Sequence, residues 1–199
     1  NSSATSETGS ITKDFTEKEE DLTAKDVKIQ RLIHSASTIH RMSFAQERLW
    51  FLHLFLEDPS AYNVTMMYHV HGPSAVAICN AMNIVLTRHQ SLRTAFFSDP
   101  KTGLPSQYVL PSASTSVKQQ SLKNERAAYE EFNQLRHYTY DLDNGETAAA
   151  TLLSEAETDH ILILGFHHIV FDGFSAQIFV KDFASVIAGK HLPTLEHQY

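Results

Sequence analysis

The chain has 199 residues, 42% of them hydrophobic and 20% charged, which is the composition of a globular protein with one or two hydrophobic cores. Its 16 Lys and Arg residues against 23 Asp and Glu residues give a formal net charge of -7 without a basic cluster, so nucleic acid is not an expected partner. The single cysteine, Cys79, excludes an internal disulfide and offers only one thiol to a zinc site.

No segment of the sequence has the pattern of a membrane span or of a secretion signal. The longest apolar runs, such as residues 161–166, are far shorter than the roughly 20 residues that cross a bilayer. Residues 1–10 lack the basic and apolar regions of a signal peptide. We therefore expect a cytoplasmic protein, or an excised piece of one, that does not bind a membrane.

Residues 1–37 have the composition of a flexible linker. They are rich in Ser, Thr, Glu, Asp and Lys, and Phe15 is their only aromatic residue. Such a segment has too little apolar surface to offset the entropy lost on ordering. Residues 26–33 have apolar positions that fit a short amphipathic helix, which would dock on the following domain; both interpretations of this stretch stay open.

Helical and strand-like patterns alternate from residue 38 onward, which predicts an α/β fold, an α+β sandwich in which helices flank a mixed sheet. The four expected helices cover residues 43–56, 74–89, 124–138 and 174–188, and the five expected strands cover residues 62–70, 92–97, 107–110, 148–153 and 160–166. Turn residues between the second and third strands predict a hairpin. The last strand is almost entirely apolar, which predicts a central position with both faces covered.

Capping residues and apolar spacing define the expected helix ends and inner sides. Ser43 and Ser74 are expected N-caps, and Gly189 is expected at the C′ position of the last helix. Helical spacing places Gln46 on the polar side of the first helix. The same spacing directs a set of large side chains toward the core, among them Phe44, Trp50, Phe55, Tyr129 and Ile178.

The segment HHIVFDG, residues 167–173, is the clearest candidate for a reactive site. Strand ends that lead into tight turns are positions where sheet proteins expose reactive groups. A histidine there can act as a general base, Asp172 can orient the turn or pair with a cation, and Gly173 permits close approach of a ligand. His167 and His168 would point to opposite faces of an extended strand, so they would not chelate one metal ion. A purely structural role for both histidines stays open from spacing alone.

Three segments together carry a resemblance to a known family. SFAQERLWFL at residues 43–52 matches the pattern SxAQxRLWxL, RHQSLRTAF at residues 88–96 matches RHxxLRTxF, and HHIVFDG matches HHxxxDG. In this order they resemble the core motifs of the condensation domains of nonribosomal peptide synthetases, which belong to the chloramphenicol acetyltransferase-like superfamily. The resemblance implies a lobe of that superfamily and an acyl transfer that forms an amide bond.

The family's motifs imply roles for five residues of this chain. His168 matches the residue that deprotonates or positions the attacking amine, or stabilises the tetrahedral intermediate, and His167 matches a structural neighbour. Asp172 matches a carboxylate that holds the turn through an ion pair, and Arg93 is the candidate partner. Gly173 would line the passage and present its backbone N–H to the thioester oxygen.

The resemblance also implies what surrounds this site. Residues 38–199 would be the N-terminal lobe of a two-lobed domain whose C-terminal lobe is absent, so we expect the isolated chain to be inactive. Substrates would arrive on the phosphopantetheine arms of an upstream acyl or peptidyl carrier domain and a downstream peptidyl carrier domain, with no intrinsic cofactor and no metal. The first and third motifs also resemble those of fungal hybrids of a polyketide synthase and a peptide synthetase. We expect carrier proteins to dock near Arg41, Arg48 and Lys181.

Two alternative functions compete with amide formation. A coenzyme A-dependent acyltransferase of the same superfamily would use HxxxD, but the matches at residues 43–52 and 88–96 favour a condensation domain. A non-catalytic lobe that only docks carrier proteins would be expected to have lost His168 or Asp172, and both are present. Ser175 is expected to cap the last helix and not to act as a nucleophile.

Overall fold

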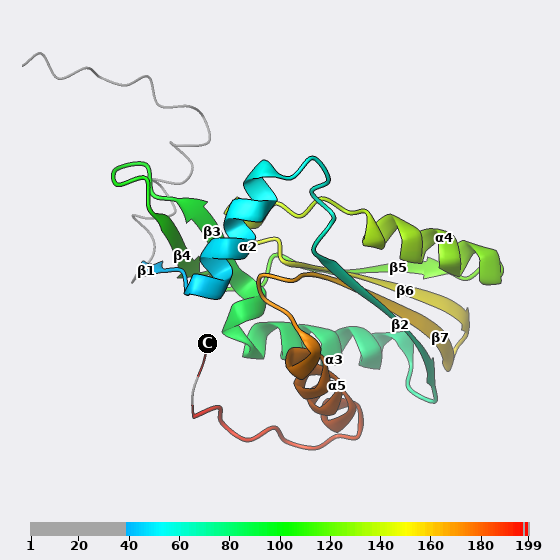
Figure 1. The fold of residues 1–199 in the computed structure, drawn as a ribbon. Helices are drawn as coiled ribbons and strands as arrows, with labels where there is room; N and C mark the ends of the chain where they lie inside the picture. Colours follow the sequence, from blue (N-terminus) through cyan, green and yellow to red (C-terminus); the bar gives the residue numbers. More distant parts are fainter. Residues whose placement is uncertain (1–38, 197, 199) are drawn as a thin grey trace, which may run out of the picture.

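The structure is a computed structural model that describes residues 39–196 and 198, and this part of the chain folds into two sheets and a set of helices (Figure 1). The strands are β1 (His40–Arg41), β2 (Asn63–His71), β3 (Thr94–Ser98), β4 (Pro105–Val109), β5 (Val117–Ser121), β6 (Ala148–Ala156) and β7 (Asp159–His167). The helices are α2 (Phe44–Phe55), α3 (Ala75–Arg88), α4 (Glu125–Arg136) and α5 (Gly173–Ile187), with short 3-10 helices η1 (Gln90–Arg93) and η2 (Leu142–Asn144).

The larger sheet has the strand order β2-β7-β6-β5, and the smaller has the order β1-β4-β3. β7 pairs antiparallel with β2 and β6, whereas β5 pairs parallel with β6, so the larger sheet is mixed. α4 covers one face of this sheet, and α3 and α5 lie on the other (Figure 1). This mixed sheet flanked by helices confirms the expected fold class.

Both faces of β7 are buried, which explains its nearly continuous apolar sequence. Leu162, Leu164 and Phe166 belong to the large core on the side of α3 and α5. Ile161 and Ile163 alternate with them and belong to the smaller core beneath α4. The predicted central strand is therefore confirmed.

The predictions of Ser43 and Ser74 as N-caps, of Gly189 at the end of the last helix, and of the hairpin are confirmed. Ser43 caps α2 through a capping box with Gln46, in which each side chain accepts a hydrogen bond from the other residue's backbone N–H. Ser74 caps α3, and Gly189, with a φ of 69°, follows the last capping residue of α5. β3 and β4 pair antiparallel across the predicted turn.

The orientation predicted for α2 is wrong in part. Trp50 is buried as expected, but Phe44 is 92% exposed and Phe55 is 71% exposed. Gln46, expected on the polar side, is only 3% exposed because it closes the capping box and exchanges hydrogen bonds of 3.1 and 3.2 Å with Gln107 of β4. The polar contact with the smaller sheet thus decides which side of α2 faces inward.

Two further side chains expected in the core lie outside it. Tyr129 of α4 is 63% exposed because Glu131, about 200° away around the helix, takes the inward position. The carboxylate of Glu131 accepts hydrogen bonds from Thr151 at 2.8 Å and from Lys118 at 3.2 Å, which satisfies it inside the structure. Ile178 of α5 is 52% exposed and lines a cavity.

β5 is a strand that the sequence pattern does not predict. Its sequence, VKQQS, lacks apolar alternation, because β5 lies at the sheet edge with four exposed residues. Within the described residues, no helix combines the length and apolar character needed to cross a bilayer. The predicted linker of residues 1–37 and the short helix of residues 26–33 lie outside the described residues.

Candidate active site

The HHIVFDG segment forms the turn that connects β7 to α5. β7 ends at His167, and the His168 N–H donates a hydrogen bond of 2.8 Å to the carbonyl of Tyr62, just before β2. Phe171 is buried at the other end of the turn, where its ring stacks on Phe166 with 3.9 Å between centroids. Main-chain pairing and aromatic packing thus fix both ends of the turn, while His168 itself is exposed.

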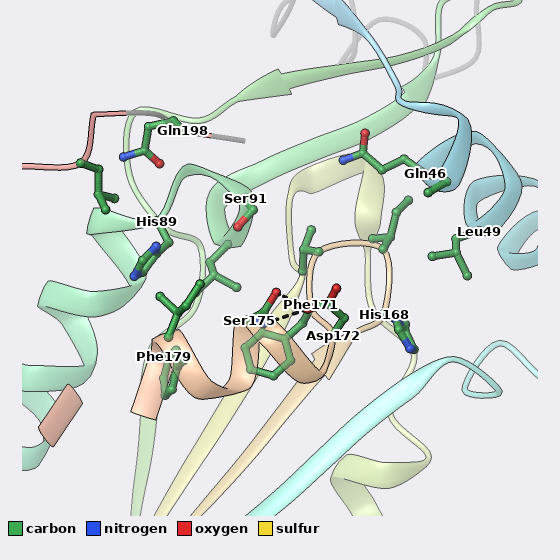
Figure 2. Close-up of a pocket in the computed structure, with 16 residues that line it drawn as sticks. Gln46, Leu49, His89, Ser91, His168, Phe171, Asp172, Ser175, Phe179 and Gln198 are labelled. Atoms are coloured by element: carbon green, nitrogen blue, oxygen red, sulfur yellow. Dashed lines mark hydrogen bonds between the residues drawn. The ribbon is translucent and has the colours of Figure 1, made fainter. Parts of the chain in front are cut away.

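His168 lines a cavity of about 480 Å³ between α2, α5 and the residues that follow α3. Figure 2 shows His168 and Leu49 on one side of this cavity and His89 and Gln198 on the other. Much of the wall is apolar and includes Leu49, Leu92, Val170, Phe171, Ile178 and Phe179. The cavity therefore combines an accessible imidazole with room for an apolar group.

His167 has the opposite environment, because it is 1% exposed and does not line the cavity. Its Nδ1 accepts a hydrogen bond of 3.2 Å from the Ile169 N–H, and its ring lies edge-on to His53 at 5.3 Å between centroids. Burial, followed by the nearby His53 and His168, lowers the pKa of His167 to about 3. His167 is therefore neutral near pH 7, and the two histidines face different environments, as their alternation predicts.

Asp172 is the N-cap of α5. One of its carboxylate oxygens accepts hydrogen bonds of 2.8 Å from both the backbone N–H and the hydroxyl of Ser175. These two hydrogen bonds lower the pKa of the Asp172 carboxyl below its ordinary value. The expectation that Ser175 caps this helix is wrong, since Ser175 is the donor and Asp172 is the cap (Figure 2).

The predicted ion pair between Asp172 and Arg93 is also wrong. The guanidinium of Arg93 donates to two backbone carbonyls, those of Thr87 at 3.0 Å and of Leu110. Arg93 ends η1 and precedes β3, so these hydrogen bonds tie the end of α3 to the strand hairpin. The arginine therefore supports the fold, and local helix capping already satisfies Asp172.

Gly173 is the first residue of α5 and is exposed. A Cβ added there would meet no described atom within 4 Å, so the described residues do not themselves require glycine at this position. Gly173 is not among the residues that line the cavity, but it follows Asp172, which is. Its predicted contact with a thioester oxygen stays a prediction.

A polar cluster that the sequence did not reveal lies on the far side of the cavity. The carboxylate of Asp182, from α5, accepts a hydrogen bond of 2.9 Å from Arg88 Nε and lies 3.0 Å from His89 Nε2. Gln198 accepts a hydrogen bond from the Gln90 N–H and donates one to the Arg88 carbonyl, which brings the C-terminal segment to the cavity. Arg88 and His89 occur in the second motif, but Asp182 lies in an apolar helical pattern that gives no sign of its pairing.

Two imidazoles line the cavity: His89 is held by Asp182 at 3.0 Å, and His168 is the exposed one. The exposed His168 can accept a hydrogen bond or a proton from a group bound in the cavity, whereas buried His167 does not line it. Ser175 donates its hydroxyl to Asp172, so this serine is not paired with His168 as a nucleophile. Among the described residues, no group of three or more His, Cys, Asp or Glu is placed to hold a metal ion.

The sequence matches one family model and several synthetases over most of its length. A family model described as Condensation domain matches residues 36–199. Fusarin C synthetase of Gibberella fujikuroi is 46% identical over 159 residues, which are 79% of this chain and 4% of that protein. The nonribosomal peptide synthetase acrB of Aspergillus aculeatus is 43% identical over 159 residues, which are 78% of this chain and 10% of that protein. The chain thus spans a tenth or less of the length of these relatives.

Solved structures share the fold at lower sequence identity. The condensation domain from the monacolin K polyketide synthase MokA matches with a TM-score of 0.75 and 23% identity, over 82% of this chain and 37% of that one. The first condensation domain of the calcium-dependent antibiotic synthetase, in complex with a substrate analogue, matches with a TM-score of 0.69 and 21% identity, over 80% of this chain and 40% of that one. In both cases the chain corresponds to less than half of the solved chain.

Proposed function

The chain belongs to the condensation-domain family, and from that premise we propose that it supplies the His168 half of an active site that joins a carrier-bound acyl group to a carrier-bound amino acid. The amine nitrogen attacks the thioester carbonyl carbon, the C–N bond forms, and the C–S bond breaks. His168 takes the amine proton and returns it to the leaving thiolate, or holds the amine in place for attack. The observation that carries this proposal is that His168 alone of the two histidines is exposed at the cavity.

Asp172 and Gly173 serve this reaction through the start of α5. The Asp172 carboxylate caps the helix and so holds the turn that carries His168, which is a positioning role. The backbone N–H of Gly173 belongs to the first turn of α5, where N–H groups have no partner within the helix. We assign this N–H to the thioester oxygen, where it would stabilise the charge that develops during attack.

The donor is an apolar acyl thioester, such as a polyketide chain. The apolar wall of the cavity beside His168 supports this choice, as does the likeness to fungal hybrid synthetases such as apdA of Emericella nidulans. Phosphopantetheine arms of an upstream acyl or peptidyl carrier and a downstream peptidyl carrier deliver the two substrates. Arg41, Arg48 and Lys181 are exposed and are our candidate contacts for these acidic partners.

A second lobe completes the substrate passage. The solved relatives are more than twice the length that this chain covers, which supports the assignment of the chain to one lobe. An isolated lobe leaves the two thioesters unpositioned and His168 open to water, and both effects slow acyl transfer. We therefore expect residues 1–199 alone to form no amide.

The test is amide formation between two loaded carrier proteins by the synthetase that contains this chain. His168→Ala should lower the single-turnover rate by about 100-fold or more, the usual contribution of a general base. His137→Ala, a change at an exposed histidine after α4, is the matched control and should leave the rate unchanged. Full activity of the His168→Ala protein would overturn the proposal.

A further inference from the structure

We propose that a cluster of buried polar atoms beside the His168 turn binds internal water, and that this water holds His167 in one tautomer. We call this cluster the rear chamber; its atoms belong to Asn63, Thr65, Tyr140 and His167. It lies on the α4 side of the larger sheet, where β2 begins and β7 ends. The proposal concerns the folding of the turn and does not depend on the proposed function.

Each residue of the rear chamber has a buried polar atom with no hydrogen-bond partner among the described residues: Asn63 Oδ1, Thr65 Oγ1, Tyr140 OH and His167 Nε2. Asn63 pairs opposite His167, and Thr65 pairs opposite Gly165, so these positions share one face of the sheet. The Tyr140 hydroxyl lies over Gly165, since a Cβ on that glycine would be 2.5 Å from it. The Tyr140 and His167 rings are 6.2 Å apart between centroids. The four atoms therefore converge on one region.

The hydrogen bond that His167 makes through Nδ1 determines whether its Nε2 is a donor or an acceptor. Nδ1 accepts from the Ile169 N–H, so it carries no proton, and the proton of the neutral imidazole is on Nε2. The lowered pKa of His167 agrees with a neutral ring. Nε2–H is therefore a buried donor that needs an acceptor. A protonated Nε2 cannot bind a cation, so a metal ion does not fit this chamber.

The other three residues supply complementary groups. The Asn63 amide nitrogen donates to the carbonyls of Arg136 at 3.1 Å and of Tyr138 at 2.7 Å, which leaves its Oδ1 as an acceptor. The hydroxyls of Thr65 and Tyr140 can each donate and accept. The chamber thus offers both donors and acceptors, which is the mixture that an internal water molecule bridges.

Water also removes an energetic conflict. Buried polar groups in native proteins are almost always hydrogen-bonded, and the groups of the rear chamber are too far apart or too poorly aligned to bond one another directly. An internal water typically makes about three hydrogen bonds to such groups. One water that accepts from His167 Nε2–H and from the Thr65 hydroxyl, and donates to the Tyr140 oxygen and to Asn63 Oδ1, satisfies all four groups. The same water fixes Nδ1 as the acceptor for Ile169 and so shapes the turn beside His168.

The experiment is heteronuclear NMR of the chain with ¹⁵N-labelled histidine, together with a crystal structure at a resolution that shows ordered water. We expect His167 to carry its proton on Nε2, this proton to show cross-relaxation with a long-lived water, and the crystal structure to place that water against Tyr140. A proton on Nδ1, or a direct protein partner for Nε2 in place of water, would overturn the proposal. These measurements use the unaltered chain, so they do not depend on the folding of any variant.

Two hydroxyl deletions provide a second test. Tyr140→Phe and Thr65→Val each remove one hydrogen bond to the water, so each should weaken the water cross-peak and shift the Ile169 amide signal. Tyr138→Phe is the matched control, because the Tyr138 hydroxyl donates to Glu146 outside the chamber. Loss of the water signal in the control but not in the two deletions would contradict the assigned site.

Discussion

The free energy of unfolding should fall as the pH is lowered from neutral to mildly acidic values. Replacing His167 with asparagine should make this acid-induced loss much smaller. Burial, followed by His53 and His168, lowers the pKa of His167 from 6.5 to about 3. Below pH 6.5 the unfolded chain therefore binds a proton that the folded chain does not, so the free energy of unfolding falls as the pH falls toward 3. Between about pH 7 and about pH 5 the loss is about 2 kcal/mol, since each unit below the unfolded pKa costs about 1.4 kcal/mol.

Urea unfolding followed by the fluorescence of Trp50, the only tryptophan, measures this effect. Asparagine can still accept from the Ile169 N–H but cannot titrate, so His167→Asn should be less stable at neutral pH and should lose about 2 kcal/mol less on acidification. His191→Asn, a change at an exposed position, controls for the other histidines. Equal acid-induced losses in the native chain and in His167→Asn would refute the assigned burial and neutrality of His167.

Three further changes test other parts of the structure. Asp172→Ala removes the N-cap of α5 and should lower the free energy of unfolding by about 1 kcal/mol, whereas Asp172→Asn, which can still cap the helix, should retain most of this stability. Equal losses of the two variants in urea unfolding would contradict the capping role. Because the pKa of Asp172 is lowered in the folded chain, its contribution is present above the ordinary pKa of an aspartate and is lost as the pH falls below it. Gly165→Ala brings a Cβ to 2.5 Å from the Tyr140 hydroxyl and should cost about 1–3 kcal/mol, and an unchanged urea midpoint would disprove that close approach. Asp182→Ala leaves the Arg88 guanidinium without its carboxylate and should cost about 3 kcal/mol, seen as a lower thermal midpoint; a normal midpoint would show that this pair does not hold α3 to α5.

The features that the sequence predicts correctly depend on local patterns. β7 could be recognised because both of its faces are apolar, and Ser43 and Ser74 could be recognised as caps because they precede apolar helical runs. The opposite environments of His167 and His168 follow from the alternation of an extended strand. Each of these inferences needs only the residues within a few positions along the chain.

The features that it misses depend on partners distant in sequence. Gln46 faces inward because Gln107, in a strand of the other sheet, completes its hydrogen bonds. The second motif does supply an arginine to an ion pair with α5, but that arginine is Arg88 and its partner is Asp182, not Arg93 and Asp172. No spacing rule could have chosen between these pairs, because the choice depends on how α3 packs against α5.

β5 and Glu131 show the same dependence on tertiary contacts. A polar edge strand carries little apolar signal, and its pairing with β6 appears only in three dimensions. Glu131 is buried only because Lys118 and Thr151 lie within hydrogen-bond distance of its carboxylate. The spacing of residues within the helix gives no sign of these two contacts, so it predicts Tyr129 in the inward place that Glu131 takes.

The most direct measurement compares His168→Ala with His167→Asn in the synthetase that contains this chain. The quantity is the single-turnover rate of amide formation from two loaded carrier proteins, corrected for the folded fraction of each variant. We expect His168→Ala to lose about 100-fold or more in rate while its stability stays within about 0.5 kcal/mol of the native protein, because the side chain is exposed. We expect His167→Asn to lose stability but to keep more of its rate than His168→Ala. A native rate for His168→Ala, beside a large loss of rate for folded His167→Asn, would show that His168 is not the residue that promotes amide formation.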